Sequence, residues 1–200
     1  MSKSILAITS SARADAVSTA LTKDILSRLK KKHDGAKVKH HDLAKKPAAF
    51  VDDAWVTANL APPDKVTPAQ KKILASSNKY VDEVLAADII VIGMPIYNFS
   101  IPAALKAWVD QIIRAKRTFA YKVGGGYEAL VPAGKKVIIV ATSGGVPVGS
   151  PYDLATPYLK HVLGFIGLTD VEIIAADQQN TLGASQTDKA KAEIAKRFAA

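Results

Sequence analysis

The chain has 200 residues, of which 48% are hydrophobic, and it carries a formal net charge of +9. This length and apolar content suit a single domain, spanning residues 1–200, with one buried core. Because cysteine is absent, disulfides, thiolate metal sites and cysteine nucleophiles are excluded. No apolar run approaches the ~18 residues of a membrane span or follows the basic start as in a signal peptide, so we expect a soluble cytoplasmic protein with no membrane partner.

The positive charge favours anionic small molecules over nucleic acid. Lysines occur in short groups along the whole chain, for example at 30–32 and 135–136. They do not form an arginine-rich stripe or a basic segment interleaved with aromatic residues. A field that attracts phosphorylated cofactors accounts for the charge without further assumptions. We therefore expect no nucleic-acid partner.

Apolar runs alternate with amphipathic segments from one end of the chain to the other. The pattern predicts, in chain order, a strand at 5–9, a helix at 18–32, a strand at 38–43, a helix at 67–86, a strand at 88–93, a helix at 103–113, a strand at 137–141, a helix at 154–165, a strand at 171–175 and a helix at 187–198. Residues 44–66 show no clean period and are interpreted as a long excursion. Residues 114–135 hold aromatic residues around three glycines and suggest a hairpin-like insertion.

Alternation of strands and helices predicts an α/β protein with a doubly wound parallel sheet and helices on both faces. Residues 89–92 are apolar without alternation, which is typical of a strand whose two faces are both covered. Five strands favour a flavodoxin-like order 2-1-3-4-5 over a six-stranded dinucleotide fold. Ligands of such sheets bind beyond the carboxyl ends of the strands, so the loops after strands one, three and four are the candidate site.

The loop after the first strand, residues 9–18, is rich in small hydroxyl residues and leads into a helix. Free N–H groups and the helix dipole make such a place a phosphate site, to which the hydroxyls of Ser10 and Ser18 could add hydrogen bonds. The loop lacks both the G-x-G-x-x-G and the P-loop patterns, so a monophosphate fits better than a dinucleotide or a nucleoside triphosphate. The alternative is that Ser18 only caps the helix.

The loops after the third and fourth strands suit a flat aromatic ligand. Residues 93–102 place Tyr97 and Phe99 beside the amide of Asn98, between two prolines that stiffen the loop. Residues 142–147 include the pair Gly144 and Gly145, which allows close backbone approach to a ring. The alternatives are an aromatic loop that closes the core and an ordinary turn.

The histidines point to no metal site. His40 and His41 are neighbours in a predicted strand, so their side chains lie on opposite faces. A structural or surface role is expected for these two as well as for His33 and His161. A Ser/His/Asp arrangement and a carboxylate-rich metal loop are both missing, which disfavours a hydrolase.

Four stretches carry a family resemblance that extends over nearly the whole chain. They are MPIYNFSIPAALKAWVD at 94–110, TFAY at 118–121, TPYL at 156–159 and LGFIG at 163–167. With these stretches the chain resembles the FMN-dependent NADH:quinone oxidoreductase/azoreductase family. Two positions depart from the family pattern: Ala16 stands where a serine is common, and Ile96 where methionine is common.

The resemblance implies a cofactor, its site and a homodimer. The cofactor would be FMN, and the phosphate would be held by Ser10, Ala16, Val17 and Ser18. The ring would be lined by Ile96, Tyr97, Asn98 and Phe99, and closed on its other edge by Thr142, Ser143, Gly144 and Gly145. The substrate space would be shaped by Phe119, Tyr121 and Phe165, partly from the partner subunit.

The resemblance also implies a ping-pong oxidoreductase. Hydride would pass from NADH, or alternatively NADPH, to FMN, and the flavin would then reduce quinones by two electrons and cleave aromatic azo compounds. No side chain would be an obligatory catalytic acid or base, because the cofactor carries the chemistry. The alternatives are a flavodoxin-like electron carrier without turnover of its own and a nucleotide-binding redox regulator. Carriers are usually acidic, unlike this chain at +9.

Overall fold

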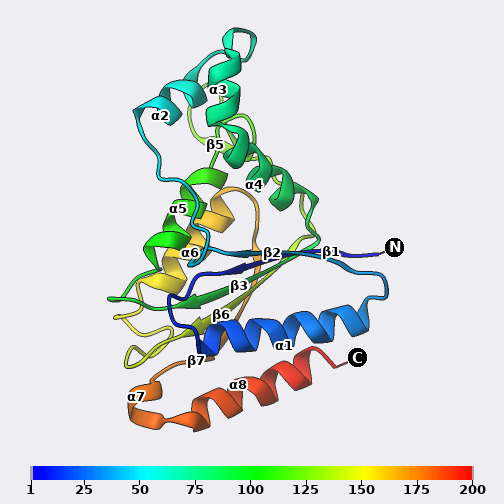
Figure 1. Ribbon diagram of the computed structural model, residues 1–200, viewed down its shortest axis with the longest axis vertical. Helices are drawn as coiled ribbons and strands as arrows, with labels where there is room; N and C mark the ends of the chain where they lie inside the picture. Colours follow the sequence, from blue (N-terminus) through cyan, green and yellow to red (C-terminus); the bar gives the residue numbers. More distant parts are fainter. Residues whose placement is uncertain (1, 200) are drawn as a thin grey trace.

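The computed structural model describes residues 2–199, apart from the side chain of Pro63. Its main sheet consists of five parallel strands in the order β2-β1-β3-β6-β7 (Figure 1). The strands are β1 (Ser4–Thr9), β2 (Lys37–Asp42), β3 (Ile89–Pro95), β6 (Lys136–Thr142) and β7 (Asp170–Ala176). Since β4 and β5 form a separate hairpin, this is the predicted order 2-1-3-4-5, and the flavodoxin-like prediction is confirmed.

Helices cover both faces of the sheet. On one face lie α1 (Val17–Lys32) and α8 (Ala184–Arg197), which pack Leu21, Ile25 and Ile194 into a core with the strands. The other face is covered by α4 (Ala75–Ala86), α5 (Ala103–Ile112) and α6 (Ala155–Phe165). The three central strands are buried on both sides, as their unbroken apolar runs predict.

The strand register aligns the carboxyl ends of the central strands. Thr9 of β1 pairs with Gly93 of β3, and Pro95 of β3 pairs with Thr142 of β6. The loops after β1, β3 and β6 therefore leave the sheet at one edge.

The excursion at residues 44–66 contains helices that its sequence pattern does not reveal. It holds α2 (Asp53–Leu60) and the 3₁₀ turn η1 (Pro63–Lys65). The helix predicted over 67–86 is two helices, α3 (Pro68–Ile73) and α4, which meet at Leu74. The predicted start is right, because Thr67 caps α3 in a reciprocal pair with Gln70. Ile73, the last residue of α3, is 41% exposed although it is apolar.

The projection formed by α2 and α3 is joined to the main body by a buried polar network (Figure 1). Trp55 Nε1 donates a hydrogen bond to Gln111 Oε1 at 2.9 Å, and the guanidinium of Arg114 lies 5.3 Å from the centre of the Trp55 ring. Arg114 also donates to Asn59 and to Ser77. Burial lowers the pKa of Arg114 from its ordinary value. A cation–π contact and neutral acceptors thus hold this projection to α4 and α5.

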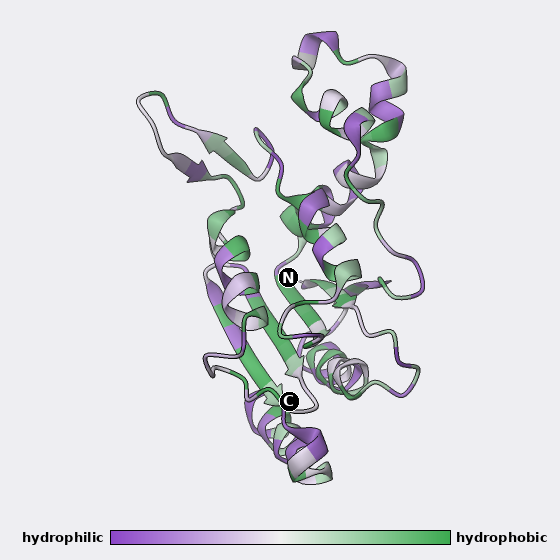
Figure 2. Ribbon diagram, turned by 90° about the vertical axis from the view of Figure 1, so that its left-hand side faces the viewer, coloured by the Kyte–Doolittle hydropathy of each residue, from purple (hydrophilic) through white to green (hydrophobic). Residues whose placement is uncertain are grey.

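The predicted insertion at 114–135 is a hairpin of β4 (Phe119–Tyr121) and β5 (Tyr127–Ala129). Figure 2 shows this hairpin extending away from the layered body. It joins the end of α5 to the start of β6, which places it at the amino-terminal edge of the sheet. Between β7 and α8 the chain also forms a one-turn helix, α7 (Gln179–Leu182), which the sequence pattern does not predict.

Candidate functional site

An open cavity of about 160 Å³ lies at the carboxyl edge of the sheet. Its walls come from the loop after β1, the end of β3, the end of β6 and the helix α7. Three of these four segments are the loops that the sequence predicts as the site. The predicted residues Ala16, Val17, Ser18, Ile96, Tyr97, Thr142, Ser143 and Gly144 line it.

The phosphate end of this cavity is built by the start of α1. The helix begins at Val17, and the capping residue, Ala16, has no side chain that could accept a hydrogen bond from the helix. Ser18 lies inside the first turn, so the interpretation of this serine as a helix cap is wrong. Its Oγ is buried, and within residues 2–199 it has no hydrogen-bond partner. An unpaired buried hydroxyl beside free helix N–H groups fits a phosphate oxygen as acceptor.

Two serines before this turn have different roles. The hydroxyl of Ser10 donates to the carbonyl of Gly93 at 3.1 Å, and Ser10 does not line the cavity. Its neighbour Ser11 does, and its Oγ lies 3.2 Å from the hydroxyl of Tyr97. The backbone N–H of Ala12 also donates to that hydroxyl, at 3.2 Å. Tyr97 therefore fixes the loop after β1 to the end of β3.

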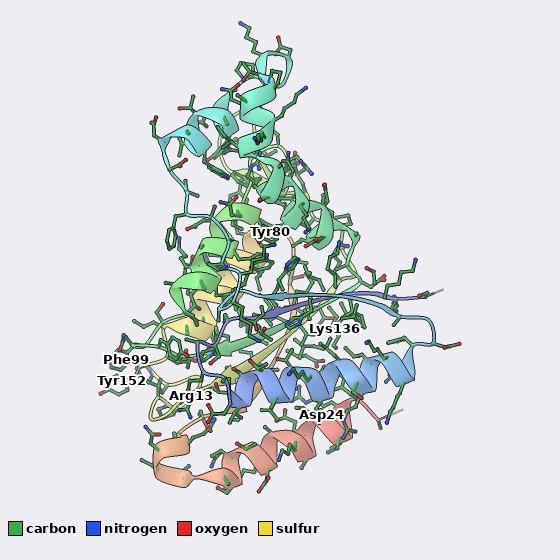
Figure 3. The ribbon with its side chains drawn as sticks, in the orientation of Figure 1. Arg13, Asp24, Tyr80, Phe99, Lys136 and Tyr152 are labelled. Carbon is green, nitrogen blue, oxygen red and sulfur yellow. The ribbon has the colours of Figure 1, made fainter. Side chains whose placement is uncertain are left out.

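An ion pair lies at the mouth of the cavity. Arg13 Nη2 is 3.0 Å from Asp15 Oδ2, and both side chains are exposed. The hydrogen bond from Arg13 keeps the pKa of Asp15 below its usual value, and the positive charge acts in the same direction. Figure 3 shows Arg13 at the lower left together with Phe99 and Tyr152, whereas Lys136, at the start of β6, lies to their right.

The chain after β3 makes a tight turn. Tyr97 and Ser100 exchange two backbone hydrogen bonds of 3.0 Å each. The central residues, Asn98 and Phe99, have φ values of 47° and 70°, as a type I′ turn requires. Asparagine tolerates this conformation, whereas for a phenylalanine it is strained and is found mainly at functional sites. Both side chains are exposed and lie outside the cavity walls, so their contact with a ring stays a prediction.

The loop after β6 is held by its own serine. The hydroxyl of Ser143 donates to the carbonyl of Val146 and accepts from the N–H of Gln178 at 3.1 Å. Gly144 lines the cavity, and a Cβ at this position would meet the side chain of Asn180 at 2.6 Å. Gly145 faces open space and is not part of the wall.

Several lining residues have no signal in the sequence. Gln179 and Asn180 come from α7, at a place where the pattern predicts only a connection between strand and helix. The ion pair of Arg13 and Asp15 lies in a loop that the sequence does single out, but the hydroxyl residues there carried the prediction.

The predicted substrate residues form a cluster remote from this cavity. The ring of Phe119 lies 4.8 Å from that of Phe165 and 5.4 Å from that of Tyr121, measured between centroids. None of the three lines the cavity. Phe165 is the last residue of α6, and the first, Ala155, follows the loop after β6 that borders the cavity. The length of this helix, about 16 Å, therefore separates Phe165 from that loop. Within one chain the cluster belongs to the opposite edge of the sheet.

The core of a single chain accommodates the large aromatic side chains of Trp108 and Phe119. Trp108 is fully buried, and Phe119 is 7% exposed. The exposed aromatic residues of this region are Tyr121 at 78% and Tyr127 at 49%.

His40 and His41 have structural partners. His40 lies 2.9 Å from Thr9 Oγ1, and His41 Nε2 lies 2.5 Å from Glu83 Oε2. In the described part of the chain no three His, Asp or Glu side chains are grouped as a metal site would require. Nor is any helix there long and apolar enough to cross a membrane.

The family model that matches residues 3–200 describes the flavodoxin-like fold, and the chain belongs to this family. Relatives within this family have names that state an activity as well as a fold. The FMN-dependent NADH:quinone oxidoreductase of Thiobacillus denitrificans is 44% identical over 96% of this chain and 92% of its own length. FMN-dependent NADH:quinone oxidoreductase 1 of Jannaschia sp. is 48% identical over 87% of each chain. Among solved structures, an azoreductase from Bacillus anthracis superposes with a TM-score of 0.88 and 27% identity over 99% of both chains.

Proposed function

We propose that this protein is an FMN-dependent oxidoreductase that uses NAD(P)H to reduce quinones and azo compounds. The observation that carries the proposal is the buried hydroxyl of Ser18 at the start of α1, which has no partner among residues 2–199 and lines a cavity bounded by the loops after β1, β3 and β6. The names of the relatives support the same cofactor and the same substrate classes.

The residues of the cavity fit FMN in their chemistry. Ser18 and the N–H groups at the start of α1 would hold the phosphate, because they donate hydrogen bonds at the positive end of a helix. Ala16 offers only its backbone there, which leaves Ser18 as the principal hydroxyl donor. Ile96 and Tyr97 would contact the ring on one side, and Thr142, Ser143 and Gly144 on the other. Asn98 and Phe99 would reach it from the strained turn above.

Bound FMN supplies two-electron chemistry, by which a hydride from NAD(P)H becomes available to a quinone or an azo bond in ping-pong order. The protein positions the groups and restricts water. The turn at 97–100 is fixed by its two backbone hydrogen bonds and by a third from Leu154 N to the Phe99 carbonyl at 3.1 Å. Because the turn is already ordered, binding of the ring would not have to pay for ordering it.

We further propose that the protein acts as a homodimer. The cluster of Phe119, Tyr121 and Phe165 lies away from the cavity of its own subunit, and the exposed side chains of the hairpin include Tyr121 and Val123. Exposed apolar groups on a projecting hairpin are suited to an interface. In the proposed arrangement these aromatic side chains shape the acceptor space of the partner subunit.

The test starts with the purified full-length chain. We expect a yellow protein with a flavin absorption spectrum, from which heat releases FMN that chromatography identifies. We also expect steady oxidation of NADH with menadione as acceptor. Recovery of FAD alone would sink the cofactor assignment. Bound FMN without steady turnover would instead identify an electron carrier.

A further inference from the structure

The helix α7 is fixed against the loop after β6 and forms one wall of the cavity. Ser143 Oγ accepts from Gln178 N at 3.1 Å, the Ser143 carbonyl from Gln179 N at 3.1 Å, and the Gly144 carbonyl from Asn180 N at 2.8 Å. Asp177 adds a hydrogen bond from Val148 N at 2.6 Å. Four hydrogen bonds thus hold this wall.

The backbone that leads into and out of α7 has an unusual conformation. Gln178 is left-handed, with φ at 51°, and Gly183 has φ at 64°. A left-handed glutamine is uncommon, and it persists only where the surrounding contacts impose it. The hydrogen bonds to Ser143 and Gly144 provide those contacts, so the residues of α7 are held at the cavity.

The side chain of Asn180 lies directly against Gly144. A Cβ at Gly144 would be 2.6 Å from Asn180 Nδ2 and 3.1 Å from its Cγ. A side chain at 144 would therefore displace the amide from this position. Asn180 lines the cavity on its open side, where the residue is exposed, and its amide makes no hydrogen bond to any other group of residues 2–199. A donor and an acceptor thus remain available there.

We propose that Asn180 is a further flavin-binding residue, whose amide hydrogen-bonds to the ring or the ribityl chain rather than to the phosphate. The sheet order supports this choice. Asn180 packs against Gly144 after β6, whereas Ser18 packs against Gly93 of the neighbouring strand β3. One strand spacing amounts to about 5 Å, which is more than a hydrogen bond spans. The inference rests on the proposed FMN function, and its test separates the two.

The test compares Asn180→Ala with Thr181→Val as matched control. Thr181 belongs to the same short helix, is exposed and donates to the Gln178 carbonyl at 3.0 Å, but it does not line the cavity. The flavin-free full chain is titrated with FMN and, separately, with riboflavin, which lacks the phosphate. We expect Asn180→Ala to raise both dissociation constants by the same factor, roughly fivefold, as for one lost hydrogen bond. Thr181→Val should change neither.

A redox measurement adds a readout that a purely structural role would not change. Asn180→Asp places a negative charge beside the flavin, so the midpoint potential of bound FMN should become more negative than in the wild type. Unchanged dissociation constants and potential would overturn the proposal. A loss confined to FMN, with riboflavin unaffected, would place the amide at the phosphate and overturn it equally. If the wild type binds neither flavin, it is the proposed function that fails.

Discussion

Replacing Ser18 by alanine should weaken cofactor binding without lowering the stability of the protein. The hydroxyl is 1% exposed and unpartnered within residues 2–199. A hydrogen bond to a charged group contributes about 1.5–3 kcal/mol, so losing the one to phosphate should weaken FMN binding at least about tenfold. Without FMN the same hydroxyl is a buried group without a partner, which costs about 1–3 kcal/mol. Removing it should leave the melting temperature of the flavin-free chain unchanged or raise it by about 2–4 °C.

Thr22→Val is the matched control for this experiment. Thr22 lies one turn further along α1, is fully buried and donates to the Ser18 carbonyl at 2.8 Å. Its removal breaks a hydrogen bond that the folded protein makes, so it should lower the free energy of unfolding by about 1 kcal/mol and leave FMN affinity unchanged. Affinity comes from fluorescence titration and stability from thermal unfolding of the flavin-free chain. If Ser18→Ala lowered the melting temperature and left the affinity unchanged, the hydroxyl would be structural and the phosphate assignment wrong.

Three further predictions concern assembly, the acceptor space and pH. Light scattering should give a dimer at assay concentration, and a fully active monomer would refute this. Phe119→Ala and Phe165→Ala should change the rate of quinone reduction more than the amount of bound flavin. If stopped-flow traces showed that only the reduction of flavin by NADH slows, these side chains would not shape the acceptor space. Burial lowers the pKa of His40 below its usual 6.5, against the opposing effect of Asp42. The unfolded chain therefore takes up more protons below about pH 6.5, so stability present above that pH is lost as the pH falls. Thermal unfolding between pH 7.5 and 5.5 should show a smaller loss for His40→Gln, and an equal loss would refute the assignment.

The sheet and its order could be predicted because the strands are unbroken apolar runs. Residues 89–92 and 137–141 are apolar throughout because both faces of these strands are buried, and this pattern indicates a central parallel strand. The helix at 53–60 could not be predicted, because only two of its residues, Trp55 and Ala58, are buried. They pack in a small separate cluster with Leu74. A short helix with such a small buried face has no detectable period in its sequence.

The phosphate loop shows where prediction from residue type stops. The sequence selects hydroxyl residues, yet Ser10 and Ser18 have different partners. The hydroxyl of Ser10 donates to the carbonyl of Gly93, whereas that of Ser18, at the helix start, has no partner among the residues that the structure describes. Ser10 directly follows β1 and therefore meets Gly93 of the neighbouring strand β3, whereas Ser18 lies in the first turn of a helix that begins at Val17. The start of that helix could not be fixed from the sequence, because no side chain caps it.

The aromatic residues pose a different problem, because their neighbours in sequence do not determine their neighbours in space. Phe119 and Phe165 meet because the hairpin after α5 and the end of α6 both lie at the amino-terminal edge of the sheet. The cavity lies at the carboxyl edge. A direct role in one active site therefore requires a second copy that brings its amino-terminal edge to this cavity, whereas a purely structural role requires none. The two readings differ in a mixed dimer. One subunit carrying Ser18→Ala and the other Phe165→Ala should retain one intact site only if each site draws its phosphate donor and its aromatic wall from different subunits in a fixed pairing. The activity of that mixed dimer, compared with the two parent variants, measures which copy supplies the wall.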